Sequence, residues 1–190
     1  MKNILVIILI ALSGNFIYAQ KVIEYKKGKD IGKLEKGVYY KSEETKERSK
    51  PFIGTWVYKN GKDIFEIKIE YGKTFLKGPD VYLDMLHIYY CYEKNGIEIS
   101  CDTTKYSYGN VSYEKQNKAS FSSFYDITKD KSGILNLELQ NNNLLQWKLG
   151  NKETIVINGS DGRGGKTLDR SFSMPMDIIL TKKNSNKVTE

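Results

Sequence analysis

The sequence predicts an all-β protein, an antiparallel meander of eight to nine strands that closes into a barrel. Two alternating runs flank Asn60-Gly61, and this dipeptide is the strongest short-range hairpin signal. A second alternating pattern begins at Leu135, and helical periodicity is confined to one short segment. A closed barrel is favoured over the alternative, a sandwich, because an open meander leaves two strand edges unpaired.

The hairpin over Pro51–Tyr71 predicts one wall of the core. A two-residue turn at Asn60-Gly61 would pair Lys59 with Lys62 and Trp56 with Phe65. Side chains alternate between the two faces of a strand, so the apolar residues share one face and the charged residues the other. The apolar face holds Phe52, Trp56, Tyr58, Phe65, Ile67, Ile69 and Tyr71, opposite Glu66, Lys68 and Glu70.

Residues 1–19 have the pattern of a cleaved signal peptide. Lys2 precedes the apolar run Ile4–Leu12, and Ile17-Tyr18-Ala19 forms a cleavage site before Gln20. The run is too short to span a bilayer. The alternative to a cleaved signal peptide is an uncleaved membrane anchor. No cysteine lies near the cleavage site, so a lipid-anchored protein is not expected. We expect a secreted or periplasmic protein.

Residues 20–50 form a lead-in to the barrel domain, which is expected over 51–183, before a disordered tail at 184–190. Lys21–Lys36 is polar and predicts an extended or poorly ordered segment. Gly37–Tyr40 predicts a short strand or an edge cover. Ser42–Arg48 predicts a short helix with Ser42 as its N-cap, stopped by Pro51.

The remaining chain divides into strands and turns. Gly72-Lys73 predicts a turn, and Thr103–Asn117 predicts a polar loop. Three-residue loops in the second alternating pattern would set Leu137 opposite Trp147, and Trp147 opposite Ile155. Further strands are expected over Val81–Glu93, Ile97–Asp102, Lys118–Ile127 and Ser171–Lys182.

The two cysteines, Cys91 and Cys101, flank the turn at Lys94-Asn95-Gly96. An oxidising compartment favours a disulfide between them, and two buried thiols are the alternative. If Glu93 pairs with Ile97 across a three-residue loop, the cysteines share a face as diagonal neighbours. If Asn95-Gly96 forms a two-residue turn, they point to opposite faces and cannot bond there. A disulfide would then need the former register, or a longer loop that sets them directly opposite.

The sequence offers no complete set of catalytic or metal-ligating residues. His87 is the only histidine, which excludes a multi-histidine metal site, and a strand histidine among apolar residues is more often a core residue. Gly159–Thr167 has five residues, not four, before its Gly-Lys pair, so it does not match a phosphate-binding loop. Asp126–Ser132 lacks the glycine and glutamate of a calcium loop. We therefore expect no cofactor and no enzyme.

Charge and tyrosine content point to the surface. The chain has 190 residues and a formal net charge of +7, with lysines spread along its length. Outside the cell this charge favours an anionic glycan or a membrane surface over nucleic acid, and the alternative is a simply solvated surface. Its 14 tyrosines suit either carbohydrate and protein contacts or the half-buried faces of a small β protein. Half of them crowd residues 82–113, namely Tyr82, Tyr89, Tyr90, Tyr92, Tyr106, Tyr108 and Tyr113.

Two resemblances bear on the fold. Gly54-Thr55-Trp56, at the start of the first core strand, resembles the G-x-W signature of lipocalins and the wider calycin group. The resemblance implies a lipocalin-like barrel and an arginine packed over Trp56, for which Arg170 is the candidate. Phe52–Gly61 carries the pattern F-x-G-T-W-x-Y-x-N-G. Together with Gly37–Lys41 and Met176–Lys182 it resembles an uncharacterised family of small secreted proteins from Bacteroidota. That family implies secretion and a shared fold but no activity.

Two functions remain open. The first is binding of a small apolar or amphipathic ligand inside the barrel. Its lining would be Trp56, Phe65, Ile67, Leu137 and Trp147. The alternative is an envelope-associated or secreted interaction protein with a filled core, which acts through a surface rich in tyrosine and lysine. An empty apolar interior would favour the first function, and a packed interior would exclude it.

Overall fold

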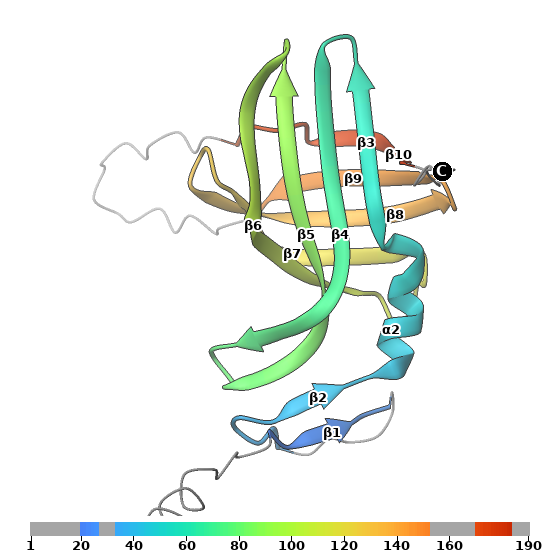
Figure 1. Ribbon diagram of the computed structural model, residues 1–190, viewed down its shortest axis with the longest axis vertical. Coiled ribbons are helices and arrows are strands. Elements are labelled where there is room, and N and C mark those ends of the chain that lie inside the picture. The colour runs from blue at the N-terminus through green and yellow to red at the C-terminus, as the bar shows by residue number, and fades with distance from the viewer. Residues whose placement is uncertain (1–19, 27–32, 153–169, 184–190) are drawn as a thin grey trace, which may run out of the picture.

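The computed structural model describes residues 20–26, 33–152 and 170–183, so the signal peptide expected at 1–19 and the tail at 184–190 lie outside the described residues. Eight antiparallel strands follow one another along the chain and close into a barrel (Figure 1). Their spatial order is β5-β4-β3-β10-β9-β8-β7-β6, and β6 pairs back with β5. The strands are β3 (Gly54–Asn60), β4 (Asp63–Leu76), β5 (Val81–Lys94), β6 (Ile97–Val111), β7 (Lys118–Asp126), β8 (Lys131–Asn141), β9 (Leu144–Asn151) and β10 (Asp177–Lys182). The lipocalin-like barrel predicted from the sequence is confirmed.

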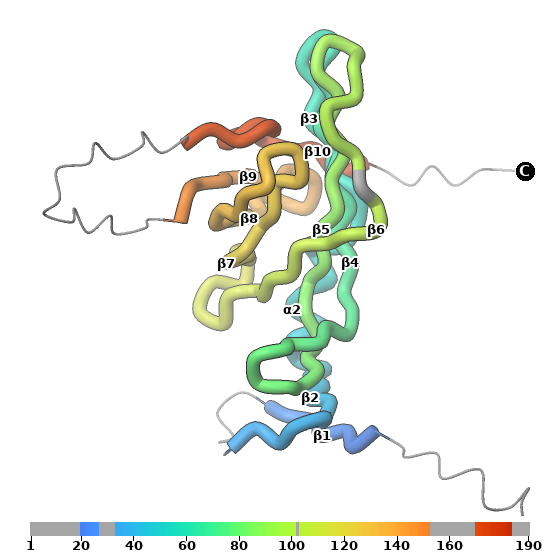
Figure 2. The backbone as a smooth tube through the Cα atoms, turned by 90° about the vertical axis from the view of Figure 1, so that its left-hand side faces the viewer, coloured from blue at the N-terminus to red at the C-terminus, as the bar shows by residue number. Residues whose placement is uncertain are grey.

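The barrel is flattened into two crossed layers. In Figure 1, β3 to β6 run nearly vertically, and β7 to β10 cross behind them nearly horizontally. The view along the sheets in Figure 2 separates the same two layers. Sheets that cross in this way enclose their core between two inner faces, and the outer faces point in opposite directions.

The lead-in forms a separate small unit at one end of the barrel. Strands β1 (Val22–Glu24) and β2 (Tyr39–Lys41) pair in parallel, and β2 pairs in parallel with the start of β5. Helix α2 (Glu43–Ser49) and the single 3₁₀ turn η1 (Lys50–Phe52) then lead into β3. The Ser42 side chain accepts a hydrogen bond of 3.2 Å from the Thr45 N–H, so the predicted N-cap is present. Val38, Tyr40 and Val81 form a second, small hydrophobic core there.

The hairpin between β3 and β4 has the predicted faces but not the predicted register. The turn residues are Gly61 and Lys62, so Trp56 pairs with Ile67 rather than with Phe65. Gly61 has a φ of +60°, which glycine adopts without strain at the first position of a tight hairpin turn. The pairing differs by two residues, an even number, so every side chain stays on its predicted face.

Three loop and strand predictions are wrong. β4 continues through Gly72-Lys73 without a turn, and β6 extends to Val111 through most of the predicted loop Thr103–Asn117. The inward positions of this part of β6 are Ser107, Gly109 and Val111, and their small or polar side chains hide the alternation. The last strand begins at Asp177, six residues later than predicted, because Phe172 and Met174 enter the core from an irregular segment.

Leu137 lies opposite Trp147, as predicted, although the connection differs. The turn holds two residues rather than three, since Asn141 pairs with Leu144. A bulge between Leu139 and Asn141 then restores the expected register. The predicted partner Ile155 lies outside the described residues.

Candidate functional site

The five residues predicted to line a ligand cavity meet in the centre of the barrel, in contact with one another or with the same neighbours. Their exposed fractions are 0% for Trp56, Phe65, Ile67 and Trp147, and 1% for Leu137. A side chain beside a cavity that holds even one water molecule keeps surface exposed to that cavity. The five residues therefore belong to a packed core, in which they have no free space beside them.

Edge-to-face aromatic contacts fill the middle of this core. The ring centres of Phe65 and Trp147 are 4.9 Å apart, and those of Phe124 and Trp147 are 5.1 Å apart. Both indole N–H groups are already used, since Trp56 donates to the Phe52 carbonyl at 2.8 Å and Trp147 to the Pro175 carbonyl at 2.9 Å. Neither indole has a free donor that could orient a ligand.

The cation over Trp56 is Lys182, not Arg170. The Lys182 ammonium lies 5.0 Å from the centre of the indole ring and donates to the Pro51 carbonyl at 3.3 Å. Arg170 is exposed and lies seven residues before β10. The last strand thus supplies the cation that the calycin resemblance implies, but from its end and as a lysine.

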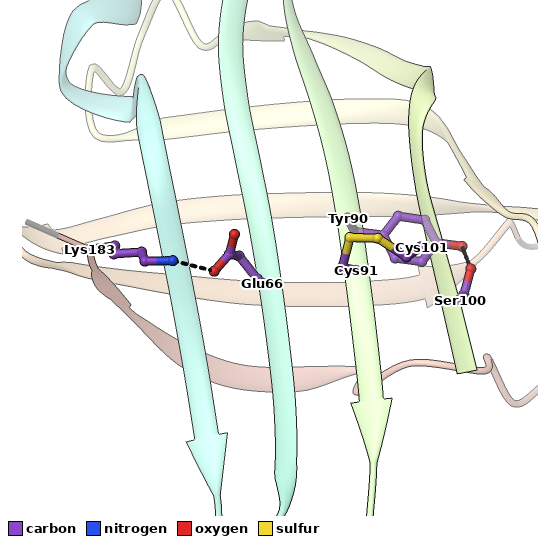
Figure 3. The surroundings of a disulfide bond; sticks show 6 residues. All are labelled: Glu66, Tyr90, Cys91, Ser100, Cys101 and Lys183. Carbon is purple, nitrogen blue, oxygen red and sulfur yellow. Dashed lines mark hydrogen bonds and ion pairs between the residues drawn. A yellow bond between two sulfur atoms is a disulfide. The ribbon is translucent and has the colours of Figure 1, made fainter. Parts of the chain in front are cut away.

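Cys91 and Cys101 form a disulfide on the outer face of the barrel (Figure 3). Asn95 and Gly96 have φ angles of 55° and 78° and form a two-residue turn, in which Lys94 pairs with Ile97. The expectation that this turn would separate the cysteines is wrong. A bulge at Ile99 adds one residue to β6 and reverses its alternation, so that the cysteines lie directly opposite with their Cα atoms 4.1 Å apart.

A second, larger bulge in β6 shapes the surface beside the disulfide. Ile88 pairs with Ser107 and Tyr90 pairs with Asp102, so residues 103–106 of β6 stand opposite Tyr89 alone. The extra chain brings the Tyr106 ring over the His87 ring, with the ring centres 3.9 Å apart and the planes 16° from parallel. Bulges redirect side chains in this way at the rims and sites of barrels.

His87 is a buried imidazole under that cover. It shares a hydrogen bond of 2.7 Å between its Nε2 and the Thr74 Oγ1. Gly72 leaves room for the ring, because a Cβ on that residue would stand 3.0 Å from the His87 Cε1. Burial lowers the pKa of His87, and the nearby Glu70 partly offsets this effect. The hydrogen bond to Thr74 and the stacked Tyr106 ring hold the imidazole in place.

An outer groove runs along the sheet from this point towards the disulfide. It encloses about 210 Å³, and its walls hold three charged side chains, two threonines, Tyr89 and Cys91. Two ion pairs border it. Lys68 pairs with Glu70 at 2.5 Å. Lys183 pairs with Glu66 at 3.0 Å, and Figure 3 shows this second pair. The residues that line the outer groove are Thr55, Glu66, Lys68, Glu70, Tyr89, Tyr90, Cys91 and Thr103.

Five of the seven tyrosines between residues 82 and 113 form two groups. Tyr90 and Tyr92 point into the core and are about as buried as the apolar residues. Tyr89, Tyr106 and Tyr108 form a tyrosine strip on the outer face around His87, and Tyr106 and Tyr108 are each 40% exposed. The sequence signal for this difference is weak, since both groups lie on alternating strands and only the bulge decides which face Tyr106 occupies.

A buried carboxylate links the lead-in to the barrel. The sequence did not predict this contact. Asp84 is 5% exposed and accepts a hydrogen bond of 2.5 Å from the Tyr39 hydroxyl. Burial and this bond raise the pKa of Tyr39 well above its usual range. Burial and the charge of Asp84 do the same for Tyr71. Among the residues that the structure describes, no three acidic, cysteine or histidine side chains are placed to hold a metal ion. The hydrogen bond from Tyr39 to Asp84 links β2 to β5.

Fold and site together define a small lipocalin-like barrel with a packed interior, a disulfide and a shaped outer face. The chain belongs to a family of unknown function, DUF6705, whose model matches residues 1–120 and 101–183. Searches of curated proteins and of solved structures gave no match. Within the described ranges, no helix has the length and apolar character needed to cross a membrane.

Proposed function

We propose that the protein is an exported interaction protein, in which the packed barrel is a rigid support and the outer face binds a partner. The observation that carries this proposal is the burial of the five predicted lining residues at 0–1% exposure. A barrel without interior space can bind a partner only on its outer surface. Export is supported by the pattern of residues 1–19, and by a disulfide of the kind that persists in oxidising compartments.

The tyrosine strip and the outer groove are the surface that we propose for this partner. Tyrosine combines a flat apolar ring with a polar tip and is enriched at protein interfaces. Tyr106 is held by His87 on one side, so little conformational entropy is lost when a partner covers the other. Within the strip, Tyr108 pairs with His87, and the disulfide links the same two strands, which restricts the geometry of this surface.

Native mass spectrometry of the protein purified from its own culture medium or periplasm tests the proposal. We expect a polypeptide that begins at Gln20, carries no small molecule and is lighter than the dithiol form by about two hydrogens. A co-purifying apolar molecule that is released on unfolding would overturn the proposal in favour of a carrier function.

Site-specific photocrosslinking in the native envelope locates the surface. A photoreactive side chain at Tyr108 should give one defined adduct. The same group at Ile179, which is 50% exposed on β10, should give none. Equal adducts from both positions would contradict a partner site on the tyrosine strip.

A further inference from the structure

Strand β1 forms an open edge of the small sheet at one end of the barrel. This sheet has the order β1-β2-β5-β4, and β1 pairs with β2 on one side and with no described strand on the other. In Figure 1, β1 is the strand farthest from the barrel. An open edge is a template for a further strand, and natural proteins often block it with proline or a bulge. Strand β1 contains neither.

The backbone groups of Val22 and Glu24 point to this open side. The Tyr39 N–H donates to the Lys21 carbonyl at 2.9 Å, so the carbonyl of Lys21 faces β2. Successive residues of a strand direct their backbone groups to opposite sides, so those of Val22 and Glu24 point away from β2. Two N–H donors and two carbonyl acceptors therefore face the open side.

A row of apolar side chains ends at the same edge. Tyr39 pairs with Val22 on one side and with Tyr82 on the other. Tyr82 in turn pairs with Phe75. Directly paired residues share a face of the sheet, so these four side chains form one apolar row across four strands. Val22 and Phe75, at the two ends of the apolar row, are 55% and 46% exposed.

The connection from β1 to β2 contacts the opposite face of the sheet. The Glu35 N–H donates to the Tyr40 hydroxyl at 2.8 Å, and the Glu35 carboxylate pairs with the Lys21 ammonium at 2.6 Å. Tyr40 and Lys21 alternate with the residues of the apolar row, so their side chains lie on the other face. Glu35 therefore contacts the face opposite the apolar row.

We infer that two copies of the chain pair through β1, antiparallel and about a two-fold axis. With Val22 opposite the same residue of the second copy, the two valines would exchange two backbone hydrogen bonds, and the two apolar rows would join into one. Lys21 precedes β1 and Glu24 ends it. An antiparallel copy therefore brings its negative end beside the positive start of the first strand.

Both charges also have a neighbour in their own chain. Lys21 pairs with Glu35, and Glu24 lies opposite Lys41, whose ammonium pairs with Glu43 at 2.6 Å. The charge complementarity therefore sets the direction in which the two strands pair rather than the strength of the dimer, which we expect to come from the backbone bonds and from Val22.

Two other arrangements fit less well. Among the described strands, residues 70–76 of β4 also pair on one side only. Lys73 is the middle residue of this stretch, and a two-fold axis there would set two lysines against each other. A strand from another protein could use the backbone groups of β1. A second copy, however, supplies a matching apolar row and charges in the complementary order.

A dimer of this kind would carry two tyrosine strips. Pairing through a strand of three residues forms a small interface, and small interfaces are weak. Two strips in one assembly would raise the avidity for a partner that offers two sites. Dimerisation through β1 is independent of the partner proposed for the tyrosine strip.

Sedimentation equilibrium of the protein purified from its own culture medium or periplasm measures the association. We expect the mass to rise from one chain to two between about 10 µM and 1 mM protein, the range of a weak interface. Hydrogen exchange at the Val22 and Glu24 amides should slow in step with the fraction of dimer, because these N–H groups become hydrogen-bonded only there.

Substitutions at Val22 separate pairing from folding. Val22→Pro removes an N–H that points away from β2, so β1 keeps its bonds to β2. The variant should dimerise at least about tenfold more weakly, because each copy loses a hydrogen bond at the two-fold axis. Val22→Lys keeps the backbone but sets two ammonium groups opposite each other, and should weaken the dimer by a similar factor. Ile97→Lys is the matched control. It adds the same charge at a side chain that is 67% exposed beside the β5–β6 turn, and should leave the dimer unchanged.

Four results would overturn the inference. The first is a single chain at every concentration, which would leave the edge to a strand of another protein. The second is a dimer in which the Val22 and Glu24 amides exchange as fast as in the single chain. The third is equal association of the wild type and Val22→Lys. The fourth is a mass that grows beyond two chains, which would indicate an open assembly instead of a two-fold dimer. A single chain that still gives the Tyr108 adduct would leave the proposed function standing.

Discussion

His87 is buried because Tyr106, which follows a bulge in β6, stacks on its ring. The imidazole lies on the outer face of β5, where a histidine would ordinarily be in water. It is 8% exposed because Tyr106 stacks on it and Gly72 gives it room. The sequence favoured a core position for His87, but Leu86 and Ile88 face the core and His87 is buried on the opposite face, under Tyr106. Neither the stacking ring nor the Thr74 hydroxyl could be read from spacing, because the four-residue bulge has no sequence signature.

The buried imidazole predicts loss of stability in mild acid. Its folded pKa is lower than that of the unfolded chain, so the unfolded state binds more protons and stability rises with pH. The contribution is complete above the unfolded pKa of about 6.5 and is lost as pH falls towards the lower folded value. We expect the free energy of unfolding, measured by denaturant titration between about pH 7.5 and 5, to fall more steeply in the wild type than in His87→Gln. Parallel curves for the two proteins would show that His87 does not titrate on unfolding.

Strand β6 shows why the extent of a strand is harder to predict than which face of it each side chain occupies. Its first half begins with a clear hairpin signal, and its second half was predicted as a loop. The inward residues there are small because β7 and the Phe121 ring come close: a Cβ on Gly109 would stand 2.3 Å from the Ser120 carbonyl oxygen and 2.6 Å from that ring. Such a close approach between strands requires glycine. Because glycine is rare inside strands, its presence makes the strand hard to predict from sequence.

Gly109→Ala should therefore lower the free energy of unfolding by about 1–3 kcal/mol, because the backbone of β7 must move to admit the methyl group. Chemical denaturation monitored by tryptophan fluorescence measures the change. Gly78→Ala is the matched control, since a Cβ there meets nothing within 4 Å. A loss of similar size in both variants would contradict the close-approach explanation.

The disulfide of the β5–β6 hairpin should contribute to stability mainly by restricting the unfolded chain. The cysteines are 10 residues apart, a short loop for which the chain-entropy relation gives about 2–3 kcal/mol. We expect the double variant Cys91→Ser, Cys101→Ser to fold with the same circular dichroism spectrum and to unfold at lower denaturant concentration. The reduced wild type is the control and should match the variant. A variant as stable as the oxidised protein would show that the bridge adds nothing.

At the scale of the whole molecule, closure and packing belong together. Strand β10 pairs with β3 through only two residue pairs, Thr181 with Val57 and Lys182 with Trp56, yet Leu180 beside them is fully buried. The barrel is closed by core packing at this seam as much as by its backbone ladder. The flattened, crossed layers bring the two inner faces close enough for Phe65, Phe124 and Trp147 to touch, which leaves the interior filled.

Trp147→Ala should cost about 3–5 kcal/mol of unfolding free energy, because the indole is fully buried at the centre of these contacts. It should also create a cavity that binds a small apolar probe such as benzene, which the wild type should not bind. Thermal unfolding with and without benzene measures both effects. The control is Ile179→Ala on the outer face of β10, where we expect a change within about 0.5 kcal/mol. Benzene binding by the wild type would contradict a packed interior.

The sequence alone determined the class of fold, the faces of the strands and the composition of the core, because alternation and hairpin turns are local properties of the chain. Phe52, Trp56, Phe65, Leu137 and Trp147 are core residues in any register that differs by an even number. Tertiary structure decided which side chains of distant strands are in contact. The bulges at Ile99 and at residues 103–106, the cation over Trp56 and the filled interior depend on how distant strands approach one another. No local pattern in the sequence encodes those distances, and they are what moves the proposed function from the inside of the barrel to its outer face.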